Sequence, residues 1–317
     1  MRKLSILFIL ISFFGYSQRT SYSPYSYFGV GETNFSATVE NQMMGGNTAY
    51  YDSVHQNMNN AASLSKLRFV NYSVGVDLKN TSYLSNSTNE NSTAAAINYI
   101  SVAIPTNLLS FSFGIKPKTS VGYLLENDDK SQTPPELNRF TGSGGVSNAF
   151  VSIGFELFKN FGIGVSSSYA FGNLNHDHSK ILEDVELYTV VVSESSISGI
   201  DYNFSTVYQK TFNEKITLYT SIVYQPEANY KSKNNQSIST INPNGGYGGD
   251  SEEIDLSAVG LKNTNIKIPN SLSVGLGFGQ DKKWFLGLNY MRTDKGGFKN
   301  ELMGLDNVEF KSEQTYS

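Results

Sequence analysis

The sequence contains no cysteine, so neither disulfide bonds nor thiolate metal sites are available to it. Charged residues are scarce, at 16% of the 317 residues, whereas Gly, Tyr and Phe number 28, 20 and 20. This balance favours β structure over a bundle of charged helices. After Gln18 there is also no apolar run of the ~20 residues that a spanning helix needs. A mature chain that crosses a membrane must therefore do so as a closed barrel, because lipid leaves the edges of an open sheet unsatisfied.

A surplus of positive charge is missing as well. Lys and Arg total 24 against 28 Asp and Glu, which gives a net charge of −4. Removal of residues 1–17, which carry Arg2 and Lys3 and no acid, would give −4 − 2 = −6. Phosphate binding needs a basic surface, so the composition excludes nucleic acid as a partner.

The N-terminus has the pattern of a secretory signal. Arg2 and Lys3 precede the apolar stretch Leu4–Phe14, and Gly15-Tyr16-Ser17 is a small-x-small cleavage site before Gln18. No Cys follows the cleavage site, which excludes a lipoprotein. The alternative is an uncleaved anchor helix, for which the apolar stretch is short. We predict a cleaved signal peptide and export.

Residues 18–66 show no regular alternation and are rich in Asn, Ser, Gly and aromatic residues. Disordered linkers are poor in aromatics, so we interpret this stretch as an irregular folded segment rather than a linker. One short helix is predicted near Ala61–Lys66.

Strict alternation of large apolar and small or polar residues begins after residue 67. In Ile268–Arg292, for example, Leu272, Val274 and Leu276 alternate with Ser and Gly, and a second strand follows a short charged turn. Successive side chains of a strand face opposite sides, so each strand has one large apolar face and one small or polar face. This suits a barrel in lipid. Further strands are predicted at 68–78, 95–104, 109–116, 149–158, 161–172, 200–209 and 216–225, and at the end of the chain.

The predicted connections alternate between short and long. Short turns are expected at Pro105–Asn107, Lys159-Asn160, Phe212–Glu214 and Gln280–Lys283, and long polar loops at roughly 80–94, 117–147, 173–198, 226–266 and 293–306. Bacterial outer-membrane barrels have short periplasmic turns and long extracellular loops. A soluble β-sandwich is the alternative, but it would not be expected to sort its connections so regularly.

Three spaced motifs carry a resemblance to a known family. Ser23–Gly31 reads SPYSYFGVG, Met44–Gly46 reads MGG and Asn60–Leu64 reads NAASL. They resemble FadL-like outer-membrane proteins of Bacteroidota, the OmpP1/FadL/TodX group, which typically show SPYS-x-FG-x-G, MGG and Asn-Pro-Ala-Ser before the first strand. The hairpin at Ile268–Tyr290 is also similar. Ala61 stands where the group has Pro, which leaves the turn geometry of that segment open.

The resemblance implies an all-β fold, an antiparallel transmembrane β-barrel with an N-terminal segment folded inward as a hatch. About ten strands are recognisable here, with Asn307–Ser317 as the tenth, against about fourteen in the group. We therefore expect the sequence to be truncated at its C-terminus. The expected division is a signal peptide at 1–17, a hatch at 18–66 and a barrel at 67–317. Candidate ligand-binding residues in the hatch are Tyr25, Tyr27, Phe28, Met44 and Asn60.

Two functions follow from this reading, both in the outer membrane of a Gram-negative bacterium. The first is a channel for hydrophobic small molecules, gated by the hatch. The alternative is a non-transporting barrel subunit of an outer-membrane secretion or assembly complex. Expected partners are outer-membrane lipid and lipopolysaccharide, together with either a hydrophobic ligand or other envelope proteins.

Chemistry is not expected. With three His in total we find no Ser-His-Asp arrangement that the fold would bring together, so we predict a non-enzyme without cofactor. A barrel phospholipase or protease is the alternative, which activity against a lipid substrate would support. The glycines Gly275-x-Gly277-x-Gly279 have a period of two with no helix after them, so they are interpreted as a strand face and not a phosphate loop.

Three charged groups have a functional and a structural interpretation. His176-Asp177-His178 could ligate a divalent metal, but we interpret it as part of a solvated loop. The acids near Glu183 and Asp250 could bind cations, yet lack the EF-hand spacing and are interpreted as surface. Glu156 and Asp201 fall on inward faces, where they either mark a polar lumen or neutralise nearby lysines.

Overall fold

The computed structural model describes residues 23–35, 37–84, 89–212, 215–242, 246–280, 283–295, 299–300 and 311–317. Strands dominate these residues, and the helices are short; η marks a 3-10 helix. In chain order the elements are η1 (Pro24–Tyr27), β1 (Glu32–Thr33), α2 (Val39–Met43), η2 (Ala61–Lys66), β2 (Asn71–Leu84), β3 (Asn89–Pro105), β4 (Ser110–Asp129), β5 (Glu136–Phe158), β6 (Phe161–Leu182), β7 (Tyr188–Phe212), β8 (Ile216–Gln225), β9 (Ala228–Asn242), β10 (Gly246–Tyr247), β11 (Glu252–Glu253), β12 (Asn263–Ile268), β13 (Ser271–Gln280), β14 (Trp284–Thr293), β15 (Lys299–Asn300) and β16 (Glu313–Tyr316).

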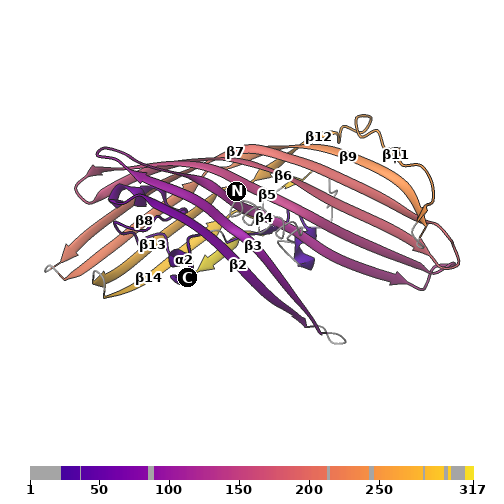
Figure 1. Ribbon diagram of the computed structural model, residues 1–317, viewed down its shortest axis with the longest axis horizontal. Helices are drawn as coiled ribbons and strands as arrows, with labels where there is room; N and C mark the ends of the chain where they lie inside the picture. The colour runs from indigo at the N-terminus through magenta and orange to yellow at the C-terminus, as the bar shows by residue number, and fades with distance from the viewer. Residues whose placement is uncertain are drawn as a thin grey trace, which may run out of the picture.

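One curled antiparallel sheet forms the wall. Ten of its sixteen strands among the described residues lie in the order β16-β14-β13-β8-β7-β6-β5-β4-β3-β2, and the other six pair off this path. Each of the four predicted short turns connects the two strands of a hairpin in this wall. The hairpins are β3–β4, β5–β6, β7–β8 and β13–β14. Adjacent hairpins place these turns at one end, which is called the short-turn end below; the other is the far end (Figure 1). The antiparallel barrel fold predicted from alternation is confirmed.

Two prolines divide long strands into two parts. Pro226 separates β8 from β9, and Pro269 separates β12 from β13. The two breaks lie opposite each other, because β8 pairs with β13 and β9 pairs with β12. Proline has no backbone N–H to donate to the hydrogen-bond ladder. Each proline therefore interrupts its strand, and the partner strand is interrupted at the same level.

In the half near the short-turn end, the two faces of the wall have the inside-out character expected in lipid. On β7, Ile200, Tyr202 and Phe204 point outward and are about half exposed, whereas Ser205 is buried on the inner face. Large apolar side chains facing outward and small polar ones facing inward are the pattern of a transmembrane barrel.

Four of the predicted long loops, 80–94, 117–147, 173–198 and 226–266, are wrong over most of their length, because strands occupy them; most of the fifth, 293–306, lies outside the described residues. β4, β5, β6 and β7 each run for 20 to 25 residues, twice the 9–11 residues or so that span a bilayer. Beyond the bilayer-spanning length, polar residues such as Asn173, Asn175 and Ser196 occupy the outer face, so apolar alternation disappears while the hydrogen-bond ladder continues. His176-Asp177-His178 therefore lies within β6 and not in a loop.

The β2–β3 hairpin diverges from the rest of the wall. β3 pairs with β4 only over Ile100–Pro105, so the edge of β4 is free of β3 from Lys116 onward. Figure 1 shows this hairpin leaving the other strands toward the far end. The N-terminal segment takes the vacated place: β1 pairs with Ser120 and Thr119, and the amide of Ser23 donates to the Gly122 carbonyl at 2.7 Å.

Residues 23–66, called the N-terminal segment below, lie against the inner face of the wall. The predicted short helix at Ala61–Lys66 is confirmed as η2, whose first five residues are all buried. None of the helices among the described residues is long and apolar enough to cross a membrane. The predicted boundary between hatch and barrel at residue 66 stays a prediction, and the predicted signal peptide lies outside the described residues.

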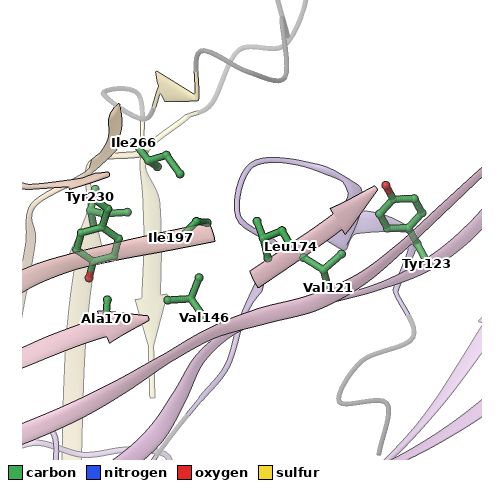
Figure 2. Packing of buried hydrophobic residues seen from close by; sticks show 9 residues of the cluster. Val121, Tyr123, Val146, Ala170, Leu174, Ile197, Tyr230 and Ile266 are labelled. Carbon is green, nitrogen blue, oxygen red and sulfur yellow. The ribbon is translucent and has the colours of Figure 1, made fainter. Parts of the chain in front are cut away.

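Toward the far end, apolar side chains fill the inner face. Val121, Val146, Leu174, Ile197 and Ile266 are each at most 3% exposed and form one cluster. They come from five strands and converge in the interior, with Tyr123 and Tyr230 on either side (Figure 2). Tyr27 and Val30 of the N-terminal segment pack against this cluster. Burial of each such side chain stabilises the fold by about 1.5–3 kcal/mol, so this cluster is a hydrophobic core like that of a soluble protein.

Candidate functional site

The five candidate residues of the N-terminal segment do not form one site. Tyr25 is 76% exposed and Phe28 is 38% exposed. Tyr27 contacts Tyr123 edge to face, with ring centroids 5.3 Å apart, and belongs to the far-end core. Met44 lines a cavity at the short-turn end. The fifth, Asn60, is completely buried and has a structural role.

Asn60 connects two parts of the N-terminal segment. Its Nδ2 donates to the Thr48 carbonyl at 2.7 Å, and its Oδ1 accepts from the Ala62 amide at 3.1 Å. It is thereby the N-cap of η2. All of its polar side-chain atoms are engaged within the segment, so its bonds are accounted for without a ligand.

Backbone-to-backbone contact joins η2 to the wall. A Cβ at Gly164 would lie 2.3 Å from the Ala62 nitrogen, and one at Gly154 would lie 2.3 Å from the Ala61 carbonyl oxygen. Real Cβ atoms do not approach other atoms so closely, so glycine is required on β5 and β6 for this approach. The Ala62 amide also donates to Ser205 on β7 at 2.9 Å.

Hydrogen bonds extend this contact around the interior. Thr48 donates to Asn289 on β14 at 2.7 Å and lies 2.8 Å from the Ser221 hydroxyl on β8. Gln56 bonds Ser101 on β3 and accepts from Ser112 on β4 at 2.8 Å. The N-terminal segment therefore bonds or touches strands β3 to β8 and β14.

The two predicted inward acids each pair with a lysine. Lys118 on β4 contacts Asp201 on β7, and Tyr230 on β9 donates to the same carboxylate, so this network crosses the interior between strands. Lys66 of η2 pairs with Glu156 at 3.1 Å. The sequence left open whether these acids mark a polar lumen or neutralise nearby lysines, and both contacts are of the second kind.

A cavity of about 330 Å³ lies at the short-turn end, between the N-terminal segment and the start of β14. Tyr50 contacts Phe285 edge to face, with ring centroids 4.9 Å apart, and Phe285 contacts Tyr219 at 5.6 Å. Sequence reasoning missed this aromatic wall. One indication was available, because Phe285 is a bulky ring on a strand face that otherwise carries Gly and Asn.

Two buried polar groups in the wall of this cavity have no hydrogen-bond partner among the described residues. They are Oδ1 of Asn41 and the hydroxyl of Tyr51, in residues that are 3% and 4% exposed. The orientation of the Asn41 amide follows from its Nδ2, which donates to the Asn47 carbonyl at 2.6 Å. Burial, and then the neighbouring Tyr219 and Glu156, raise the pKa of Tyr51 well above its ordinary value, so its hydroxyl stays neutral.

Acidic groups border the same cavity. Asp52 accepts from the amides of Val54 and His55 at 2.8 and 2.6 Å, and its second oxygen lies 2.7 Å from the His55 ring. Glu40 is a second acid of the lining, and among the described lining residues Lys283 contributes an ammonium group. The described lining therefore carries two carboxylates, Glu40 and Asp52, and the ammonium group of Lys283.

The histidine motif lies in a strand, and its two rings contact aromatic side chains of neighbouring strands. His176 contacts the Tyr123 hydroxyl at 2.6 Å, and His178 stacks on Phe140 with centroids 4.4 Å apart, while Asp177 lies on the opposite face of the strand. No group of three metal-ligating residues occurs within the described ranges. The predicted solvated loop is also wrong, since both rings are in strand β6 and packed against neighbours.

A family model described as BamG matches residues 1–317, the whole chain. The chain belongs to the BamG family. No curated protein matches it at a significant level.

Solved structures of hydrocarbon channels are also similar to this chain. The CymD monoaromatic hydrocarbon channel aligns with a TM-score of 0.52 and 14% identity over 91% of this chain and 79% of that one. A ΔS2S3 mutant of the TodX monoaromatic hydrocarbon channel aligns with a TM-score of 0.50 and 14% identity over 81% and 71%. The toluene transporter TodX of Pseudomonas putida gives 0.47 and 14% over 90% and 76%. The likeness to CymD shows the fold, so the FadL-like barrel fold predicted from sequence is confirmed. The expected Bacteroidota origin and C-terminal truncation stay predictions.

Proposed function

We propose that this BamG-family chain is an outer-membrane β-barrel that acts as a non-transporting subunit of an outer-membrane assembly complex. The observation that carries this proposal is the seal of the interior. The N-terminal segment meets the wall backbone to backbone at Gly154 and Gly164 and bonds to strands around the interior. Passage of a ligand through the interior would need part of this segment to move, and the contacts of that part would then be broken.

Two further barriers support the proposal. The Lys118–Asp201–Tyr230 network crosses the interior beyond the segment, and the apolar core that includes Leu174 and Ile197 follows it toward the far end. A ligand that passed through the interior from one end to the other would meet all three. The family name is consistent with an assembly-related role. The sequence favoured transport, and these contacts support the assembly role instead.

Co-purification tests this proposal. The full chain, tagged at its C-terminus, is extracted from its native outer membrane in mild detergent, and bound proteins are quantified by mass spectrometry after size exclusion. We expect a partner at a fixed molar ratio, absent from an unrelated barrel of similar abundance purified in parallel. A monomeric preparation under conditions that keep other outer-membrane complexes together would contradict the proposal.

A hydrophobic-molecule channel is the second candidate, favoured by the aromatic cavity at Tyr50 and Phe285 and by the hydrocarbon channels that share the fold. In this reading the N-terminal segment is a hatch that moves. Toluene entry into vesicles containing the purified barrel separates the two functions. The assembly proposal expects entry no faster than in vesicles holding an unrelated closed barrel, and rapid saturable entry would favour the channel.

A further inference from the structure

Two lysines on the outer face of β9 lie just beyond the apolar band of the wall. On β7 the outward residues change from apolar to polar between Ile200 and Ser198. Lys231 is the register partner of Ser198, and Lys233 is that of Ser196. Both lysines are exposed, and the residues that alternate with them along β9 are buried on the inner face. Their side chains therefore lie on the outside of the wall, where its polar half begins.

The depth of these two lysines matches the headgroup layer of a membrane. They are successive outward residues, so they lie about 6.6 Å apart along the strand, which is about 5 Å in depth for a strand tilted by about 45°. A bilayer with a hydrocarbon core of about 30 Å and a total thickness of about 40–45 Å has roughly 5–7 Å of headgroups on each side. Lys231 and Lys233 therefore span the layer in which the charged groups of lipids lie.

The neighbours of the two lysines on the same face are neutral hydrogen-bonding residues. On β7 they are serines, and on β12 they are Asn265 and Asn263, the register partners of Lys231 and Lys233. Ser and Asn side chains donate to phosphate oxygens, and they also exchange hydrogen bonds with hydroxyl groups. A phosphate held between the lysines would thus have further donors on both sides.

The positive charge of this sector is not neutralised by the chain itself. Glu227 forms an ion pair with Lys267 at 2.9 Å. Glu194, the outward acid of β7, lies two residues further toward the far end than the register partner of Lys233. Neither Lys231 nor Lys233 is ion-paired with another residue that the structure describes. Two neighbouring ammonium groups repel each other, so an anion between them is favoured.

The charge is also restricted to one side of the wall. β9 and β12 lie beside β7 toward the far end (Figure 1). On the strands that continue the sheet in the other direction, the corresponding outward residues are neutral: Asn173 and Asn175 on β6, and Ser143 on β5. A general attraction to headgroups would distribute lysines around the whole wall, so their confinement to β9 favours one bound lipid.

We propose that Lys231 and Lys233 bind a phosphate group of a phosphorylated glycolipid, the lipid A part of lipopolysaccharide. Short turns of bacterial barrels are periplasmic, so the far end faces the outer leaflet. A sugar headgroup is taller than that of a phosphoglycerolipid and offers hydroxyl groups, which suits two lysines at different depths flanked by Ser and Asn. The inference rests on the outer-membrane location in the proposed function, and it applies to an assembly subunit and to a channel alike.

Lipid binding to the intact barrel tests this inference. The full chain is purified in mild detergent, stripped of bound lipid and titrated with diphosphoryl lipid A, and the bound molecules are counted by native mass spectrometry. Dephosphorylated lipid A, phosphatidylglycerol and inorganic phosphate are tested in parallel. We expect one saturable diphosphoryl lipid A per chain, bound at least about tenfold more tightly than the other two lipids, because hydrogen bonds to charged groups contribute at least one factor of ten. Inorganic phosphate should not displace it.

Substitutions locate the site. Lys231→Gln combined with Lys233→Gln removes both charges at exposed positions and leaves the backbone ladder unchanged, so binding of diphosphoryl lipid A should weaken about tenfold or more. Lys231→Arg combined with Lys233→Arg keeps both charges and should retain binding. Lys215→Gln, an exposed lysine at the short-turn end, is the matched control and should change nothing. Circular dichroism confirms that each variant is folded.

Three results would overturn the inference. Equal affinity for lipid A with and without phosphates would show that phosphate is not recognised, and unchanged affinity in the double glutamine variant would place the lipid elsewhere. Equal affinity for phosphatidylglycerol, or displacement by inorganic phosphate, would show that a glycolipid is not selected. Co-purification of a stoichiometric protein without lipid A binding would overturn this inference and leave the assembly proposal standing. Lipid A binding by a chain that co-purifies with no partner would do the reverse.

Discussion

The pairing register of strands β6 and β7 continues along their whole length, but the two halves carry their apolar side chains on opposite faces of the sheet. Near the short-turn end Phe204 faces outward and Ser205 inward; toward the far end Ile197 faces inward and Ser196 outward. The change falls between Ile200 and Ser198 on β7, and between Phe171 and Asn173 on β6. Since Phe171 pairs with Ser198, the two positions are adjacent in the sheet.

The reversal marks where the surroundings of the strands change. In lipid the outer face must be apolar, and the interior is left to small residues that admit the N-terminal segment. In water the outer face becomes polar and the apolar residues gather inside, as in a soluble protein. A single hydrogen-bonded ladder therefore serves a membrane wall at one end and a water-exposed, ordinarily packed structure at the other.

The largest effect is expected in the far-end core. Leu174→Ala removes a side chain that is 2% exposed and packed on every side, and buried Leu→Ala changes cost about 2–5 kcal/mol. Unfolding of the purified barrel in guanidinium, followed by circular dichroism, measures the change. Asn173→Ala, one position away on the outer face, should be close to neutral. Similar losses for both would show that the far-end half has no core.

A charge on the outer face tests the boundary itself. Phe204→Arg places a guanidinium where lipid is expected and should lower the free energy of unfolding in vesicles by about 2–4 kcal/mol at mid-bilayer depth. The same residue introduced at Ser196, on the outer face beyond the boundary, should cost within about 0.5 kcal/mol. Equal costs would place both positions in one environment and contradict a boundary between them.

A single added methyl group tests the seal. Gly164→Ala sets a Cβ against the Ala62 nitrogen, and overpacking of this kind costs about 1–3 kcal/mol. Either the wall or the N-terminal segment must shift, so we expect faster cleavage of residues 23–66 by added protease in intact vesicles. Ser168→Ala, which changes the same inner face without adding atoms, is the control. Protection equal to that of the unmodified chain would show that the segment is not held at η2.

The short-turn half was predictable because one physical requirement dominates it. Lipid on one side forces large residues to alternate with small ones, and Phe204 beside Ser205 shows this directly. The far-end half was mistaken for loops because no such requirement acts there. Along Asn173, Asn175 and His176 both faces carry polar residues, and the backbone ladder that holds them leaves no mark in the sequence.

The candidate site was predictable only in part. Aromatic enrichment pointed to the N-terminal segment, and Met44 does line the cavity. The aromatic wall, however, joins Tyr50 to Phe285, residues far apart in the sequence, and the unpartnered Asn41 is recognised only after its neighbours are placed. For Asn60 the sequence could not separate the two roles, because a buried cap and a ligand contact use the same side-chain chemistry; the structure shows the cap.

The smallest expected effect is that of low pH, which should act on the cavity through Asp52 and leave the far-end core unchanged. Burial of Asp52 raises its pKa, but hydrogen bonds from His55 and Val54 lower it more, so the pKa lies below its ordinary value of about 3.8. A carboxyl with a depressed pKa stabilises the fold fully above its unfolded pKa, and that contribution is lost as pH falls from about 3.9 through the folded value. The fluorescence of Trp284, which lines the cavity, should therefore change below about pH 4 in the unmodified chain and stay flat in Asp52→Asn. Since the far-end core contributes no such group near Trp284, a transition of equal size in both proteins would mean that another acid controls the cavity.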